Sequence, residues 1–220
     1  MMATVLEPKK QVQADERFLI RGVDWQAYEA ILKALGDHRT RVTFDGRNLE
    51  LMSPSPVHEF YKIMFGRLLE TLAFDLNFEI RGGGSMTFRR QDLERGLEPD
   101  QCYWIQNELS IRGRQDIDLS VDPPPDLAIE IDISRSALDR MAIYGGLEIP
   151  EVWTFNGESI RIHLLQADGK YVASETSRCL PWLPVAEMIP FLQPDDKSGE
   201  TARTRRFVSQ VRRHFSQGNG

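Results

Sequence analysis

The chain begins with segments in which apolar residues recur first at helical spacing and then at every second position. Residues 24–36, DWQAYEAILKALG, open on a helix-capping residue, Asp24, and close on Gly36, so they predict a helix. The next stretch, RVTFDGRNLELMSPSP, has two short alternating runs on either side of Asp45 and Gly46. Because Asp-Gly is typical of a tight turn between strands, this stretch predicts a β-hairpin.

The remaining chain continues as a mixture of both patterns. A second helix is expected from Ser55 or Pro56, with an apolar stripe formed by Phe60, Ile63, Met64, Leu68, Leu69 and Leu72. Strands are expected in FEIRGGG, SMTFRR, EPDQCYWIQ, PPPDLAIEIDIS, EVWTF, SIRIHLL and YVAS. A short helix in SRSALDRMAIYGG is expected to be capped by Ser136 with Asp139. The order of elements predicts the α/β class, as an α+β mixed sheet flanked by helices.

The length of 220 residues predicts one compact domain with additional terminal segments. We expect a flexible N-terminal segment at 1–17, the domain at 18–195, and a basic C-terminal helix or tail at 196–220. In that last segment Phe207, Val211 and Phe215 recur at every fourth position beside several arginines. This favours a helix docked by its apolar stripe, with a solvated basic face, over a nucleic-acid contact.

Composition and charge narrow the functional classes. The net charge of −6 argues against a surface coated with Lys and Arg for non-specific binding to nucleic acid. It does not exclude a nuclease, because cations bound by a carboxylate cluster reverse the local field. The two cysteines lie far apart and form no zinc or redox motif, and no stretch has the length and apolarity of a membrane span. We therefore expect a soluble, cytoplasmic protein with no membrane partner.

One predicted strand carries acids among its apolar residues. Alternation in PPPDLAIEIDIS places Asp126, Glu130 and Asp132 on the same face. A carboxylate taken out of water is costly unless it is paired or binds a cation, and oxygen ligands favour magnesium or manganese. Glu130, midway along the strand, is therefore a candidate functional residue, whereas Asp126 directly follows prolines and is interpreted as a turn residue.

Other candidates lie outside this strand. Asp100 begins an apolar segment and would meet Glu130 if the two segments formed neighbouring strands; its alternative is a turn role. His58 and Glu59 fall in the first turn of the second helix, where the helix dipole favours an acid without any functional reason. Arg140 either reaches back across the end of the acidic strand or points into solvent, and the residues alone leave both alternatives open.

Several of these motifs together resemble a known family. Pro99-Asp100, an apolar strand that ends shortly after Glu130, and a short helix followed by GLEIPEVW are similar to the Uma-type restriction endonuclease family. This family was long labelled a domain of unknown function and belongs to the PD-(D/E)XK nuclease superfamily. The resemblance spans residues 20 to 195 and is most specific from PPPDLAIEIDIS through IPEVW.

The resemblance implies a restriction-endonuclease-like core and a divalent-metal site for phosphodiester hydrolysis. By position, Asp100 and Glu130 match the two acids of the PD-(D/E)XK motif, as ligands of Mg²⁺ or Mn²⁺. His58 matches a polar or acidic position on the preceding helix. Asp132 stands where the superfamily has its lysine, and Arg140 stands where many relatives have a lysine on the following helix. An arginine stays protonated, so it can clamp a phosphate but cannot act as a base; Asp132 or His58 would then assist in deprotonating water.

The predicted function is that of a divalent-metal-dependent endonuclease acting on DNA, with Asp100, Glu130, Asp132, Arg140 and His58 as its catalytic residues. A homodimer would fit this function, since cutting both strands of a duplex calls for two sites related by a two-fold axis. The alternative is a catalytically decayed module of the same fold that binds DNA or protein without cleavage, which the missing lysine and the acidic balance favour. A sugar hydrolase with paired carboxylates is the weakest alternative, because aromatic residues make up only 9% of the chain.

Overall fold

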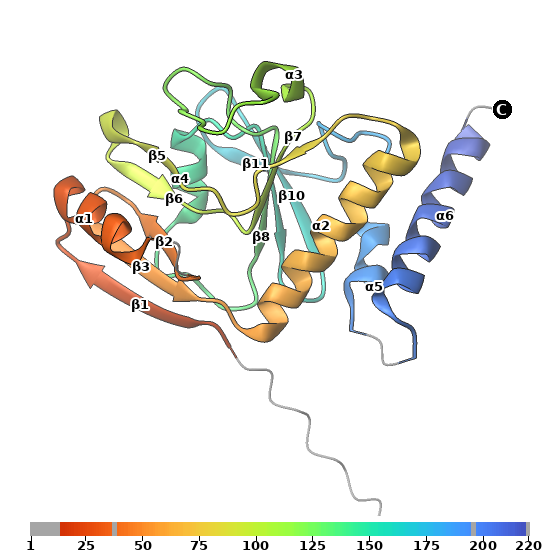
Figure 1. The fold of residues 1–220 in the computed structure, drawn as a ribbon, viewed down its shortest axis with the longest axis horizontal. Coiled ribbons are helices and arrows are strands. Elements are labelled where there is room, and N and C mark those ends of the chain that lie inside the picture. The colour runs from red at the N-terminus through yellow and green to blue at the C-terminus, as the bar shows by residue number, and fades with distance from the viewer. Residues whose placement is uncertain (1–13, 37–38, 195–196, 219–220) are drawn as a thin grey trace, which may run out of the picture.

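The computed structural model describes residues 14–36, 39–194 and 197–218, with side chains up to His214. One sheet in this part of the chain is antiparallel and has five strands, in the order β1-β3-β2-β6-β5 (Figure 1). Its strands are β1 (Glu16–Arg21), β3 (Asn48–Ser53), β2 (Arg41–Phe44), β6 (Arg95–Leu97) and β5 (Phe88–Arg90). The hairpin predicted around Asp45 and Gly46 is confirmed, because β2 and β3 pair in antiparallel register across that turn.

The second sheet has six strands, in the order β11-β10-β9-β8-β7-β4. Its strands are β11 (Tyr171–Ser174), β10 (Ile160–Leu165), β9 (Glu151–Phe155), β8 (Leu127–Ile131), β7 (Gln101–Trp104) and β4 (Arg81–Gly82). The central strand β8 is buried at every position; it pairs antiparallel with β7 and parallel with β9. The predicted α/β class, with mixed sheet and flanking helices, is confirmed.

Helices cover the six-stranded sheet and one side of the five-stranded sheet (Figure 1). The α-helices are α1 (Trp25–Leu35), α2 (Pro56–Leu76), α3 (Glu108–Ile111), α4 (Arg140–Gly146), α5 (Ile189–Leu192) and α6 (Glu200–Gly218). Short 3₁₀ helices are η1 (Gln91–Leu93) and η2 (Val185–Met188). The long helix α2 contacts β8 on one side and α5 and α6 on the other. It therefore forms a layer between the central sheet and the C-terminal helices.

The sequence explains why α2 begins and ends where it does. The hydroxyl of Ser55 accepts a hydrogen bond from the backbone N–H of His58 (3.3 Å), Pro56 occupies the first turn, and Asn77 ends the helix in the left-handed conformation. Of the predicted apolar stripe, four residues are fully buried in the main core: Met64, Leu68, Leu69 and Leu72. Ile63 was expected in that stripe but is 50% exposed, since the buried face of α2 is centred on the neighbouring positions.

Two boundaries differ from the sequence-based expectation. The strand β1 begins at Glu16, inside the segment expected to be flexible, because ERFLIR pairs along its whole length with β3. The helix α4 begins at Arg140, with Asp139 as its N-cap, rather than near Ser136. The Ser136 hydroxyl instead donates to the carboxylate of Glu50 on β3 (2.8 Å), which holds this residue in a loop.

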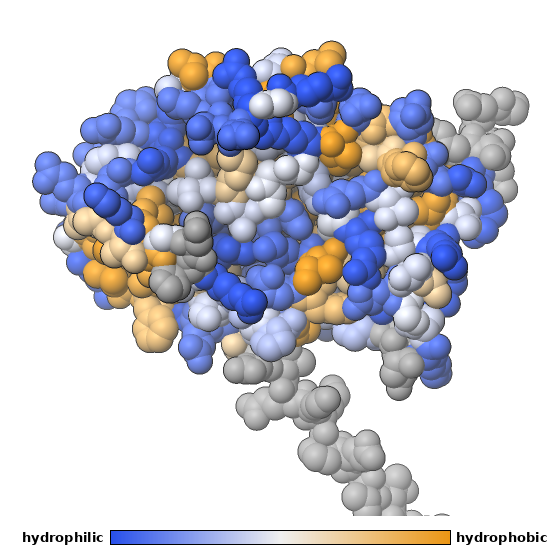
Figure 2. Space-filling view, viewed as in Figure 1, coloured by the Kyte–Doolittle hydropathy of each residue, from blue (hydrophilic) through white to orange (hydrophobic). Residues whose placement is uncertain are grey.

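The C-terminal helix α6 packs against α2 through buried Phe207 and Val211, as its apolar spacing predicts. The side chain of Phe215, the third residue of that pattern, lies outside the described residues. Hydrophilic residues dominate the face in Figure 2, while hydrophobic residues gather near α1 and β1. Within the described ranges, no helix is long and apolar enough to cross a membrane.

Candidate functional site

The central feature of the site is a pair of carboxylates on neighbouring strands. On β7 and β8, Gln101 lies opposite Ile129, so the same register places Asp100 opposite Glu130. Opposite residues of an antiparallel pair point to the same face of the sheet, with their Cβ atoms about 5 Å apart. Both side chains are almost completely buried, at 2% exposure for Asp100 and 11% for Glu130. The structure thus brings together the two acids that the sequence singled out.

Both oxygens of Asp100 accept hydrogen bonds from the protein. Its Oδ1 accepts from Nε2 of His58 (2.8 Å), and its Oδ2 accepts from the backbone N–H of Ile131 (2.8 Å). Burial alone would raise the pKa of this carboxyl group, but the bond and positive charge of His58, with the Ile131 amide, outweigh burial and lower it. Asp100 is therefore ionised and held in a fixed orientation.

His58 lies between two carboxylates. Its Nδ1 is 3.1 Å from Oδ2 of Asp15, and its Nε2 bonds Asp100 on the other side. Burial would lower the pKa of His58, but hydrogen bonds and charge attraction from Asp100 and Asp15 raise it to about 9. Since both ring nitrogens face carboxylates, both donate, and His58 is an imidazolium cation at neutral pH.

Asp15 was missed by the sequence analysis. It directly precedes β1 and accepts a hydrogen bond from the backbone N–H of Ser55 (2.8 Å) as well as the contact from His58. Burial would raise its pKa, but the bonds from His58, Ser134 and Ser55 lower it far below the usual range. No local pattern marks this aspartate, because its hydrogen-bond partners are at least 40 residues away along the chain.

Glu130 forms an ion pair with an arginine from the following helix. Its Oε1 accepts from the guanidinium of Arg140 (2.6 Å) and from the hydroxyl of Tyr144, whereas its Oε2 has no hydrogen-bond partner among the described residues. Burial and the negative charge of Asp100 raise the pKa of Glu130, although Arg140 acts in the opposite direction. The second oxygen of Glu130 is thus the acceptor in this pair that the protein leaves open.

Arg140 reaches back across the end of β8, which decides between the two alternatives left open by the sequence. Besides Glu130, it donates to the backbone carbonyl of Glu98 (2.9 Å) and to the hydroxyl of Thr43 on β2. Its Nε is buried without a partner in the described structure. The guanidinium therefore joins the five-stranded sheet to the central strand and places a permanent positive charge beside the acidic pair.

The other two acids of the strand have different surroundings. Asp132 lies just beyond β8 and is exposed; its backbone N–H donates to the carbonyl of Phe155 (2.7 Å). Asp126 accepts hydrogen bonds from the backbone N–H groups of Ile105 (2.7 Å) and Asn107 (3.0 Å). These amides lie 21 and 19 residues away along the chain, so Asp126 holds the segment that follows β7 rather than a local turn after the prolines, and the turn interpretation of Asp126 is wrong in this respect.

Lys62 was also missed by the sequence analysis. It lies one turn after His58 on α2, and its side chain is only 15% exposed. Burial, and then the nearby charge of Arg41, lower its pKa, although attraction to Glu59 and Asp100 opposes the shift. The spacing of four residues from His58 was the available signal, because it places both side chains on one face of the helix.

A cleft of about 1610 Å³ opens next to Arg140's partner Glu98. It lies between α1, the segment 86–92 that contains β5, and the loop at 115–120. Its walls carry Lys33, Arg89 and Arg90 together with Glu98 and several further acids. Asp100 and Glu130 are not among the residues that line it. The cleft thus reaches a residue that binds Arg140 but does not open onto the acidic pair.

The donor set can be tested against a divalent metal ion. Magnesium is usually bound by one or two carboxylates and keeps several water ligands. Asp100 and Glu130 supply two such carboxylates, and the open Oε2 of Glu130 is an available acceptor. Within the described ranges, no group of three or more His, Cys, Asp and Glu residues could hold a metal ion. Asp100 and Glu130 are thus the two carboxylates that a hydrated ion would use at this site; His58 is excluded as a ligand because both its nitrogens are hydrogen-bonded.

Comparisons with known proteins agree with this fold. Residues 25–193 match the model of the Uma2 family, described as "Putative restriction endonuclease". The chain is also similar in structure to a "putative nuclease belonging to DUF820" from Anabaena variabilis ATCC 29413. That match has a TM-score of 0.50 and 11% sequence identity, and it covers 86% of this chain and 99% of the other. No curated protein sequence matches the chain.

Proposed function

Because this chain belongs to the Uma2 family, whose model matches residues 25–193, we propose that it is a divalent-metal-dependent endonuclease that hydrolyses phosphodiester bonds in DNA. One observation carries the proposal: Asp100, directly before β7, lies opposite Glu130 on β8 when the register of the two strands is extended by one residue, so both side chains share one face of the sheet. Two buried carboxylates in that arrangement repel each other unless cations compensate them.

In this proposal Asp100 and Glu130 hold a magnesium or manganese ion. When bound, such an ion makes water a stronger nucleophile and offsets negative charge on the phosphate. The charge and bonds of His58 keep Asp100 ionised and fix its orientation. Arg140 contributes a guanidinium that can donate two hydrogen bonds to a phosphate once it releases Glu130.

The proton that leaves the attacking water needs an acceptor. His58 does not suit this role in its present contacts, since both ring nitrogens already carry protons. Lys62 has a lowered pKa and interacts with the charge of Asp100, so we assign it this role ahead of Asp132. Asp132 is exposed at the end of β8 and remains the second candidate.

The proposal is tested by titrating manganese into the wild type and into Glu130→Gln by calorimetry, followed by incubation of the loaded protein with supercoiled plasmid. Glu158→Gln, an exposed carboxylate in the turn after β9, is the matched control. We expect the wild type and the control to bind manganese and to nick the plasmid, and Glu130→Gln to do neither. Equal manganese binding by the wild type and Glu130→Gln would refute the assignment of the metal site.

The buried ion pair between Arg140 and Glu130 (2.6 Å) favours a second candidate function. The imidazolium of His58 balances the negative charge of Asp100, and the guanidinium of Arg140 balances that of Glu130, so the acidic pair needs no metal ion to offset its charge. A protein in this state would bind DNA or another partner without cutting. Plasmid that stays intact with manganese, combined with duplex binding that Glu130→Gln leaves unchanged, would support this second function over the first.

A further inference from the structure

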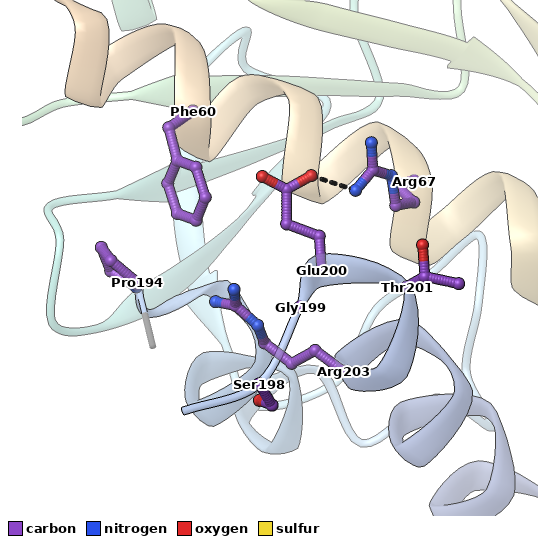
Figure 3. Close-up of a pocket in the computed structure, with 8 residues that line it drawn as sticks. All are labelled: Phe60, Arg67, Pro194, Ser198, Gly199, Glu200, Thr201 and Arg203. Atoms are coloured by element: carbon purple, nitrogen blue, oxygen red, sulfur yellow. Dashed lines mark hydrogen bonds and ion pairs between the residues drawn. The ribbon is translucent and has the colours of Figure 1, made fainter. Parts of the chain in front are cut away.

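A second polar pocket lies between α2 and the start of α6, formed by residues that the proposed nuclease site does not use. Its volume is about 830 Å³, and it is lined by Phe60, Arg67, Pro194, Ser198, Gly199, Glu200, Thr201 and Arg203. Figure 3 shows Arg203 extending from α6 with its guanidinium between Phe60, Pro194 and Glu200. The pocket therefore has a cationic group at its centre.

Arg203 is a buried cation that forms no ion pair with any carboxylate in the described parts of the chain. It is only 2% exposed, yet no carboxylate in the described parts of the chain lies within ion-pair distance of it. Its guanidinium donates to the carbonyl of Gln193 and lies 5.7 Å from the ring centre of Phe60, whereas its Nε is buried without a partner. Burying an uncompensated charge is strongly unfavourable, so this arrangement calls for an anion.

Among the described residues, two other arginines have a buried Nε without a partner, and both differ from Arg203 in having a carboxylate nearby. Arg140 has an equally unpartnered Nε, but its charge is compensated by Glu130 at 2.6 Å. Arg41 also has an unpartnered Nε, and Glu59 lies 3.7 Å from its guanidinium. Glu200 lies close to Arg203 in Figure 3, but its carboxylate is bonded to Arg67.

The start of α6 adds a second attraction for an anion. Gly199 occupies the cap position, where its carbonyl accepts from the N–H of Arg203 (3.1 Å), and a Cβ at this glycine would meet nothing within 4 Å. In the described structure, the backbone N–H groups of Glu200, Thr201 and Ala202 have no acceptor. Unpartnered amides at a helix N-terminus bind phosphate groups through hydrogen bonds and the helix dipole.

From these observations we propose that the pocket binds a phosphate group, with the Arg203 guanidinium and the first-turn amides of α6 as its donors. A tetrahedral phosphate has enough oxygens to accept from both sets of donors at once, and an arginine fork matches it. The phosphate can come from a DNA strand or from a free phosphate compound. This site does not depend on the proposed metal-dependent activity.

The proposal is tested by thermal unfolding of the full chain in EDTA, with inorganic phosphate titrated at constant ionic strength. The wild type should gain roughly 3 to 6 °C at ten times the dissociation constant. Arg203→Met, which can still pack over Phe60, should lose this gain. Thr201→Glu keeps Arg203 and places a carboxylate at the helix start, so it should lose the gain without unfolding. Arg205→Gln, an exposed arginine on the same helix, should behave like the wild type.

A second measurement distinguishes the two sources of phosphate. A fluorescent DNA duplex is titrated in EDTA with the wild type and with Thr201→Glu at several salt concentrations. Weaker binding by the variant, with a log–log salt slope smaller by roughly 1, would identify a DNA phosphate as the ligand. Unchanged duplex binding with the phosphate response intact would identify a free phosphate compound. No phosphate response in the wild type, or an equal response in Arg203→Met, would overturn the proposal, whereas absence of cleavage would bear only on the metal site.

Discussion

The contacts of His58 predict a stability that depends on pH in a defined window. In the folded chain the pKa of His58 is raised from 6.5 to about 9, because Asp100 and Asp15 stabilise its protonated form more than burial destabilises it. Raising a pKa from 6.5 to about 9 corresponds to roughly 3 kcal/mol of preferential stabilisation. Because the folded-state pKa is the higher one, this contribution is fully present below pH 6.5 and is lost as the pH rises through about 9.

The assay is urea unfolding in EDTA at a series of pH values from below 6.5 to above 9. The wild type should lose roughly 3 kcal/mol of unfolding free energy across this window, and His58→Gln should lose far less. His214→Gln, at an exposed histidine on α6, is the control and should follow the wild type. If His58→Gln does not fold, Asp15→Asn removes one of the two partners, and the fall in stability should shift to lower pH. The same pH dependence in the wild type and His58→Gln would refute the reasoning.

Three further predictions concern the acidic strand. Arg140→Met should bind manganese more tightly than the wild type in calorimetry, because the guanidinium no longer competes with the metal ion for the carboxylate of Glu130. Plasmid nicking by this variant should fall, because the phosphate loses the same guanidinium. Tyr144→Phe should lower the unfolding free energy by about 1–3 kcal/mol in urea, since a bond to a buried carboxylate is lost, and an unchanged midpoint would contradict it. Asp126→Ala should cost a similar free energy, because the N–H of Asn107 loses its acceptor, yet it should leave manganese binding unchanged.

The acidic strand was predictable because its signal is local. Glu130 interrupts an apolar run of alternating pattern, and the family motif pairs it with Asp100. The structure places Asp100 directly before β7, where the strand register sets it opposite Glu130 on β8. The role of Asp126 did not follow from the preceding prolines, because the amides that it binds, those of Ile105 and Asn107, lie 21 and 19 residues away along the chain.

The partners of these acids were not predictable in the same way. Asp15, Thr43 and Glu98 reach the site from the five-stranded sheet and its connections, so only the packing of two sheets brings them near Glu130 and Asp100. The position of His58 between two carboxylates depends on the same packing. A capping pattern at Ser136 gave the wrong start for α4, since a buried carboxylate elsewhere in the chain competes for that hydroxyl.

The five-stranded sheet also explains how a positive charge reaches the acidic pair. The strand β8 is followed by Asp132 at the motif position of a lysine, so the positive charge comes from Arg140 on α4 instead. The loop between β8 and α4 is tied to this sheet, because Arg17 on β1 donates to the Ser134 hydroxyl (3.0 Å) and Ser136 donates to Glu50 on β3. These contacts fix the point where α4 begins, and Arg140 is its first residue. The cation beside Glu130 is thus positioned by the five-stranded sheet, through the loop contacts to β1 and β3 and through its own bond to Thr43 on β2. Its charge can therefore be withdrawn from the acidic pair only if this loop or the guanidinium itself moves.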